Sequence, residues 1–195
     1  MLFQGQEFAS SSPFTYFADH AHEPELAQAI AKGRKESLAN FRSMNNKQML
    51  ETIPLPHDRK NFESCKLDFS DRQTNAGLYL LTKELLRLRR EDQVFSRQHY
   101  GTLDGAVLNE DAFVIRFFGA ADSGDRLLCV NMGRDLHLPT YPQPLTAPPL
   151  RQKWSQILST EEPCFDGSGA PDCYETGRLY LSAHSAVVLR SIDLE

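Results

Sequence analysis

The densest group of side chains that could bind a metal or transfer protons lies in one short segment, Asp19, His20, His22 and Glu23. Metal ligands on a helix are spaced one turn apart, as in the HExxH pattern. These four residues are nearly consecutive instead, so a solvated loop that caps the following helix is the favoured interpretation. We therefore expect no metal site in this chain, and nothing in the sequence calls for a cofactor.

Other groups with catalytic potential are also better explained structurally. Glu161 and Glu162 are adjacent, so in a strand they point to opposite faces and cannot flank one bond. Cys164 has no neighbour in sequence that would activate a thiol. Residues 166–170 are rich in glycine but lack the lysine of a phosphate-binding loop, which favours a turn. None of these groups forms a catalytic constellation.

The segment with the clearest mechanistic position is 1–8. Its apolar run stops at Gly5 and is followed by Gln6, Glu7 and Phe8, a pattern that predicts a buried strand with these three residues at its end. In parallel β/α sheets the residues at the carboxyl end of a strand face the ligand. These three side chains are therefore candidate substrate-binding residues. An equally weighted alternative is that Glu7 only hydrogen-bonds the loop 10–12.

Two helices are expected in the first half of the chain. Pro24 at a first-turn position and the apolar stripe that follows predict a helix over about 24–40. Ser70 and Asp71 offer an N-cap for a second helix. Its apolar face is formed by residues at helical spacing, namely Leu78, Leu81, Leu85 and Leu88. The polar stretch 42–61, with two prolines, favours irregular structure.

The second half has a different pattern, with short apolar or alternating runs separated by turn residues. These runs are 106–108, 113–118, 127–131, 154–158, 179–181 and 186–190. Such spacing, with no helical period, is typical of an antiparallel sandwich or small barrel. We therefore expect an α+β chain divided into a helical part, 1–92, and an all-β part, 93–195. Trp154, which opens one run, is more typical of a core residue than of a sugar-stacking one.

The overall composition excludes several classes of protein. The 195 residues carry a net charge of −5, which disfavours nucleic acid as a partner. No apolar stretch approaches the ~20 residues of a membrane-spanning helix. Four cysteines follow no CxxC pattern, which favours free thiols and a cytoplasmic location. The oligomeric state is not predicted by these features.

Several motifs in order resemble one family. Residues 1–8 followed by 12–20 are similar to the eighth barrel strand and its loop in the α-amylase superfamily, and within it to the malto-oligosyltrehalose trehalohydrolases. Further similarities, in chain order, are 25–29 with Gly33 and Arg34, then 62–69, 85–90 and 125–138. The last of these looks like the start of the family's C-terminal sandwich. The resemblance extends over essentially the whole chain.

The resemblance implies the last β/α units of a (β/α)8 barrel followed by an antiparallel β-sandwich. The implied activity is hydrolysis of the α-1,4 bond that joins trehalose to a malto-oligosaccharide, with two carboxyl groups about 5 Å apart. In the family these groups and a third acid lie on earlier strands, upstream of Met1, so no catalytic residue is assigned here. We expect this chain to be inactive alone and the full-length protein to bind a malto-oligosaccharide or trehalose-containing glucan.

Two other functions stay open at this point. The chain could be a non-catalytic β-sandwich module that binds α-glucan or docks onto another protein. It could also be a fragment of a related branching or debranching enzyme, although the loop 13–20 disfavours this by resemblance.

Overall fold

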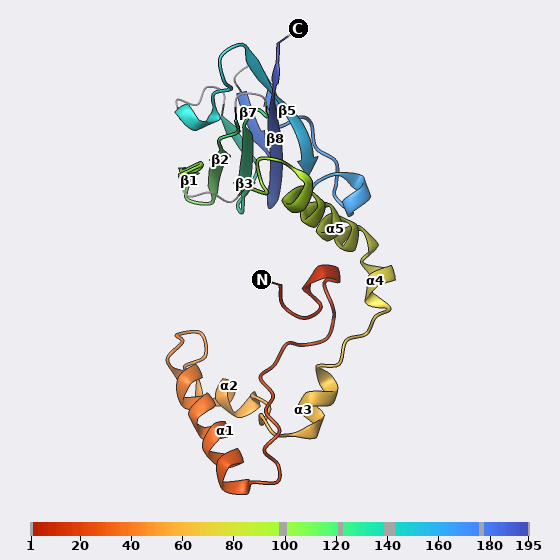
Figure 1. Cartoon of the computed structure of the whole chain (residues 1–195). Coiled ribbons are helices and arrows are strands. Elements are labelled where there is room, and N and C mark those ends of the chain that lie inside the picture. Colours follow the sequence, from red (N-terminus) through yellow and green to blue (C-terminus); the bar gives the residue numbers. More distant parts are fainter. Residues whose placement is uncertain (1, 98–100, 121–122, 139–142, 176–177, 195) are drawn as a thin grey trace. The chain divides into compact units, whose positions relative to one another are not determined.

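A computed structural model describes residues 2–97, 101–120, 123–138, 143–175 and 178–194. The chain forms two compact units, Met1–Asn75 and Ala76–Glu195 (Figure 1). The helix over 76–91 is grouped with the β-strands that follow because it packs against them. The expected boundary at 92/93, between the end of a barrel and a β-sandwich, stays a prediction.

The first unit is helical. It contains η1 (Gln6–Phe8), α1 (Pro24–Ala39), α2 (Lys47–Thr52), α3 (Arg59–Ser64) and α4 (Asp71–Thr74). Helix α1 confirms the predicted helix, whereas α2 and α3 occupy a stretch expected to be irregular. Their N-caps explain this difference, because the side chains of Asn46 and Asp58 each accept a hydrogen bond from the first turn.

The first unit has little apolar interior. Among its described residues only Phe8, Ala27 and Ala31 are buried hydrophobic side chains. Large apolar side chains such as Phe14, Phe41 and Phe62 are instead more than 40% exposed. Since burial of apolar surface is the main stabilising term in folding, this unit is expected to be only marginally stable.

The strand expected over 1–8 is absent from the residues described, and Met1 lies outside them. Gln4 and Gly5 form a turn, and residues 6–8 form the 3₁₀ helix η1. A parallel strand needs neighbouring strands to pair its backbone groups. The described part of this unit has no strand, so local bonds satisfy the backbone, including Gln6 N–H to the Phe3 carbonyl at 3.0 Å.

The second unit begins with α5 (Ala76–Glu91), which confirms the predicted leucine-rich helix. A five-stranded antiparallel sheet in the order β1-β2-β3-β8-β5 follows. Its strands are β1 (Leu103–Asn109), β2 (Ala112–Phe117), β3 (Arg126–Asn131), β5 (Gln152–Ser159) and β8 (Ser185–Asp193). Each contains one of the predicted runs or most of it.

A smaller antiparallel sheet in the order β4-β7-β6 completes the second unit. Its strands are β4 (Leu136–Leu138), β7 (Arg178–Leu181) and β6 (Tyr174–Glu175), with short helices η2 (Pro144–Thr146) and η3 (Pro163–Phe165) in the connections. Buried side chains of both sheets form one core, among them Val114, Leu127, Trp154, Leu181 and Leu189. The predicted antiparallel sandwich is therefore confirmed.

Strand β5 contributes to both faces of the large sheet. Trp154 lies in the core between the sheets, whereas Leu158 packs with Leu88 of α5 and Val188 of β8 on the opposite face. Residues four apart in a regular strand would share a face. A β-bulge between Gln156 and Leu158 inserts one residue and switches the side on which Leu158 lies.

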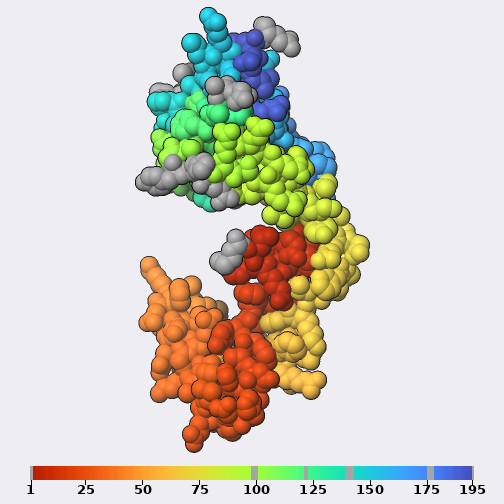
Figure 2. Space-filling model, viewed as in Figure 1, coloured from red at the N-terminus to blue at the C-terminus, as the bar shows by residue number. Residues whose placement is uncertain are grey.

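Helix α5 packs on the β5 and β8 side of this second face and adds a third layer there. Its Leu88 is buried against Leu158, Phe165 and Val188. In Figure 2 the yellow-green atoms of this part of the chain lie against the green and blue atoms of the residues that follow. Among the described residues, no helix combines the length and apolar character needed to cross a lipid bilayer.

Candidate functional site

The three predicted substrate-binding residues lie in η1 and differ in exposure. Gln6 is exposed, and its Oε1 accepts a hydrogen bond from the Phe3 amide at 3.0 Å. Glu7 is half-buried. Phe8 is 0% exposed, with its ring 6.1 Å from that of Phe69 and 5.2 Å from the Arg72 guanidinium. Phe8 thus packs in the interior of the unit, and the binding role of the three residues stays a prediction.

The loop 10–12 is held by Asp71, a residue for which the sequence predicted a helix-capping role. The Asp71 carboxylate accepts hydrogen bonds from the Ser11 amide at 2.8 Å and from the hydroxyls of Ser10 and Ser11. No side-chain bond caps α4 at Ser70. Asp71, rather than Glu7, therefore makes the contact that the sequence left open.

Asn61 holds the aromatic segment that follows, although sequence reasoning missed it. This side chain is 3% exposed; its amide nitrogen donates to the Tyr16 carbonyl at 2.9 Å, and its oxygen accepts from Thr15 at 2.6 Å. A polar residue on a short, weakly patterned helix gives no sequence signal for a partner about 45 positions away.

The loop with two histidines carries exposed side chains. Within the described ranges no group of three or more His, Cys, Asp or Glu side chains is placed to hold a metal ion. The His22 Nε2 atom lies 3.2 Å from Oε1 of Glu23, and both side chains are exposed. Glu161 accepts hydrogen bonds from Ser168, so it orders the glycine-rich turn.

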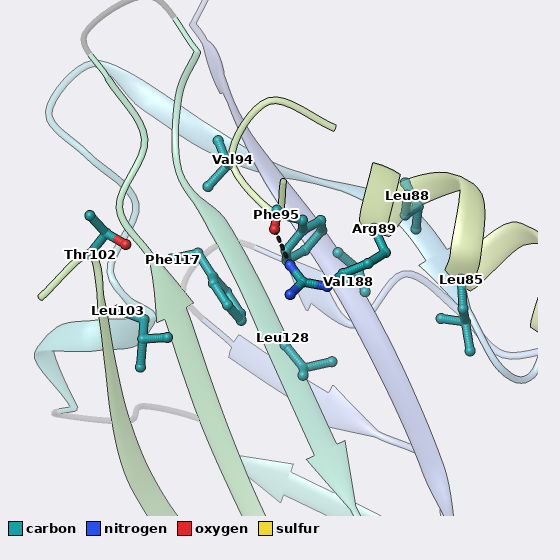
Figure 3. Close-up of a pocket in the computed structure, with 10 residues that line it drawn as sticks. All are labelled: Leu85, Leu88, Arg89, Val94, Phe95, Thr102, Leu103, Phe117, Leu128 and Val188. Carbon is teal, nitrogen blue, oxygen red and sulfur yellow. Dashed lines mark hydrogen bonds between the residues drawn. The ribbon is translucent and has the colours of Figure 1, made fainter. Parts of the chain in front are cut away.

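The second unit has an apolar pocket of about 670 Å³ on the α5 face of its large sheet (Figure 3). Its walls come from α5, from the segment after it, and from the strands β1, β2, β3 and β8. The lining residues are Leu85, Leu88, Arg89, Val94, Phe95, Thr102, Leu103, Phe117, Leu128 and Val188. The pocket lies where α5 leaves the β1 and β2 side of the sheet uncovered.

The described lining of this pocket is mostly apolar. Phe95 packs edge-on against Phe117, with 5.0 Å between ring centroids. The Arg89 guanidinium donates to the Phe95 carbonyl, so the one cation of the described lining is already engaged. No carboxyl group lines the described pocket, whereas glycoside hydrolysis needs two. The pocket suits an apolar side chain or ring.

A buried ion pair lies on each face of the large sheet. On the sandwich side, Arg116 donates to the Asp125 carboxylate at 2.7 and 2.8 Å and lies beside the Trp154 ring. On the α5 side, Arg126 donates to Asp92 at 2.9 Å. Both guanidiniums are at most 11% exposed, so each needs its carboxylate to compensate lost hydration.

The four cysteines are free and lie in different environments. The Thr15 hydroxyl, 2.8 Å from the Cys65 sulfur, lowers the pKa of that thiol. Partial desolvation and the nearby Glu162 carboxylate raise the pKa of Cys164. A hydrogen bond with Cys173 and burial raise the pKa of Cys129. Cys129 and Cys173 both lie in the sandwich core, so they serve packing rather than catalysis.

Comparison with known proteins gives matches in both sequence and fold. Residues 101–188 match the family described as "Domain of unknown function (DUF3459)". The malto-oligosyltrehalose trehalohydrolase of Deinococcus radiodurans is 36% identical over 137 residues, which covers 69% of this chain and 21% of that protein. The protein of the same name from Mycobacterium tuberculosis is 36% identical over 94 residues, covering 47% and 15%.

Solved structures share the fold at low sequence identity. A Salmonella typhimurium protein assigned as an alpha amylase has a TM-score of 0.63 at 21% identity, covering 96% of this chain and 27% of that one. The trehalulose synthase MutB of Pseudomonas mesoacidophila MX-45 has a TM-score of 0.53 at 15% identity, covering 98% and 35%.

The sequence relatives agree in name and in the small share of their length that is matched. The chain spans only 15 to 21% of the length of the two trehalohydrolases described above. By these matches the chain is similar in sequence to malto-oligosyltrehalose trehalohydrolases over a small share of their length, and a fragment of such a protein fits them.

Proposed function

We propose that this chain is the C-terminal portion of a glycoside hydrolase that releases trehalose from maltooligosyltrehalose. In this proposal residues 1–92 correspond to the end of a (β/α)8 barrel and 93–195 to the appended β-sandwich. The barrel supplies the catalytic carboxylates, and this chain releases no trehalose by itself. Gln6, Glu7 and Phe8 contribute to the wall of the sugar cleft when the barrel is complete.

One observation carries this proposal. The identity of 36% over 137 residues is to a protein whose name states the activity, and the match covers only 21% of that protein. The rest of the relative is where the proposal places the acid and the nucleophile. Described carboxylates such as Asp71, Asp92, Asp125 and Asp166 are engaged in structural hydrogen bonds, which agrees with a supporting role for this portion.

The proposed location is the cytoplasm, where the pathway substrate would be an intracellular glucan. Its support is that all four cysteines are free, which suits a reducing compartment. Labelling of the cysteine thiols of the native protein in separated cell fractions would test this location. Recovery of the protein in an exported form with oxidised thiols would contradict it.

Two assays test the activity. Purified chain incubated with maltooligosyltrehalose is expected to release no trehalose above a buffer blank, and measurable turnover would overturn the inactive-alone proposal. A chimera in which this chain replaces the matching part of the Deinococcus radiodurans trehalohydrolase is expected to release trehalose. A chimera that folds, as judged by circular dichroism, and yet has no activity would contradict the assignment to this enzyme.

A further inference from the structure

Two of the four cysteines share the core between the two sheets. Cys129 lies in β3, which is paired on both sides, with β2 and with β8. Cys173 directly precedes β6 of the small sheet. The two side chains are 0% and 2% exposed and belong to the same apolar cluster. The Cys173 thiol is the hydrogen-bond partner of the Cys129 thiol, so a thiol from each sheet layer meets the other across the core.

The backbone of Cys173 is held from two sides. Its carbonyl accepts a hydrogen bond from the Tyr180 amide of β7 at 2.8 Å, and its amide donates to Gln156 Oε1 of β5 at 3.4 Å. A disulfide forms without backbone movement only when the two Cβ atoms point toward each other. Side chains that already contact each other within a fixed frame approach in this way.

We propose that Cys129 and Cys173 form a latent disulfide site, which a peroxide closes into a covalent link between the two sheets. This inference goes beyond the proposed function and does not depend on it. In a reducing compartment the two thiols stay reduced, and the link forms when hydrogen peroxide is in excess.

The reaction proceeds in two steps that balance. The sulfur of Cys173 attacks one oxygen of hydrogen peroxide, the O–O bond breaks, and a sulfenic acid forms on Cys173 with release of one water. The sulfur of Cys129 then attacks the sulfur of Cys173. The S–S bond forms, the S–O bond breaks, and the leaving hydroxide takes the proton of Cys129 as a second water. Two electrons pass from the thiols to the peroxide.

The position of each residue determines which thiol reacts first. Cys173 lines a surface concavity of about 400 Å³, and its neighbours Pro171 and Asp172 are exposed. It precedes a two-residue strand at the edge of the small sheet, and edge segments open locally more easily than central strands do. Cys129 lies in an inner strand of the large sheet. Cys173 is therefore the thiol that the peroxide reaches, and Cys129 resolves the sulfenic acid.

The link is expected to stabilise the second unit. Cys129 and Cys173 are roughly 44 positions apart, so a bond between them restricts a long loop of the unfolded chain. Immunoglobulin domains use an inter-sheet disulfide beside a buried tryptophan, and Trp154 lies in the same core as these two cysteines. We expect oxidation to raise the Tm by at least about 5 °C.

The rival explanation is that the two cysteines only fill space, since buried structural thiols are usually inert. Inert thiols predict that Cys129 and Cys173 are both alkylated when peroxide-treated chain is unfolded without reductant. A latent disulfide predicts that these two are protected and that dithiothreitol makes them reactive again.

The experiment treats the whole chain with hydrogen peroxide and maps the unreduced tryptic peptides by mass spectrometry. Cys164→Ser is the background, because Cys164 is exposed and shares the peptide 154–178 with Cys173. We expect this peptide to be linked to 127–134, which contains Cys129. The gain in Tm should be reversed by dithiothreitol. Cys65→Ser, which removes a thiol from the first unit, is the matched control and should form the same link.

Single substitutions in the Cys164→Ser background test the order of reaction. In the Cys129→Ala variant, dimedone is expected to trap a sulfenic acid on Cys173. In the Cys173→Ala variant, Cys129 should stay unmodified under the same conditions. Both variants should lose the peroxide-dependent gain in Tm. Dimedone on Cys129 rather than on Cys173 would overturn the assigned order.

The native chain alone is enough to reject the site. Alkylation of both thiols after peroxide treatment, or a link that joins either one to Cys65 instead, overturns the proposal. A link between Cys129 and Cys173 that lowers the Tm would show that the core does not accommodate the bond, and would overturn it as well. None of these results depends on trehalose release, so the proposed function is tested separately by its own chimera.

Discussion

The carboxylate of Asp166 accepts a hydrogen bond from the backbone amide of Gly77, 3.1 Å away, in the first turn of α5. Asp166 follows η3 and has a left-handed backbone conformation, with φ of 65°. The first amides of a helix have no partner within it, and the positive end of its dipole favours a carboxylate. A residue 89 positions away therefore caps the helix that covers the large sheet.

Replacing Gly77 tests how closely this contact is packed. A Cβ at position 77 would overlap the Asp166 carboxylate and lie 2.7 Å from the carbonyl carbon of Phe165. We expect Gly77→Ala to lower the free energy of unfolding of the second unit by about 1–3 kcal/mol, as overpacking does. Urea titration followed by circular dichroism measures this.

Gly33→Ala in α1 is the matched control for that substitution. A Cβ at position 33 meets nothing within 4 Å, so alanine is expected to be neutral or stabilising by up to about 1 kcal/mol in the first unit. Equal effects of the two substitutions would show that close packing at Gly77 is unimportant.

The ion pair between Arg116 and Asp125 gives a second prediction. Asp125→Ala leaves a guanidinium that is 11% exposed without its carboxylate, which is expected to cost about 3–5 kcal/mol. Asp193→Ala, which removes an exposed carboxylate bonded only to Gln152 among the described residues, should change stability by less than about 0.5 kcal/mol. Denaturant unfolding of both variants is the measurement, and similar midpoints would refute the role of burial.

The free thiols give a prediction about pH. Because the Thr15 hydroxyl lowers the pKa of Cys65, its alkylation rate should reach half-maximum at a lower pH than that of glutathione. Desolvation and the Glu162 carboxylate raise the pKa of Cys164, so its midpoint should lie at a higher pH. Thr15→Val should raise the first midpoint and Glu162→Gln should lower the second. Peptide mass spectrometry of iodoacetamide-labelled chain measures both, and coincident midpoints would count against these contacts.

Limited proteolysis tests the difference between the two units. The first has few buried apolar side chains, whereas the second has a continuous core. We expect the resistant fragment to begin near residue 76, because α5 packs on the large sheet. N-terminal sequencing identifies the cut, and a fragment that begins near residue 93 would show that α5 is released with the first unit.

The sequence predicted those elements whose signal is local. The stripe in α1, the leucines of α5 and the alternating runs of the strands each determine their own element, and Trp154 lies in the core as favoured. Residues 2–8 failed as a strand because strand formation depends on partners outside the segment. The roles of Asp71, Asn61 and Asp166 were missed because each bonds a group roughly 45 to 90 positions away, which no local pattern encodes.

The bulge between Gln156 and Leu158 has a consequence for how the large sheet assembles. With the extra residue in place, Trp154 and Leu158 reach their separate layers only when β5 is aligned with β8 in one way. Sliding β5 by one position would bring the indole out of the sandwich core and the leucine away from α5 together. The bulge thus specifies a single alignment of the edge strand β5 with β8, because any shift by one residue would move both side chains out of their layers.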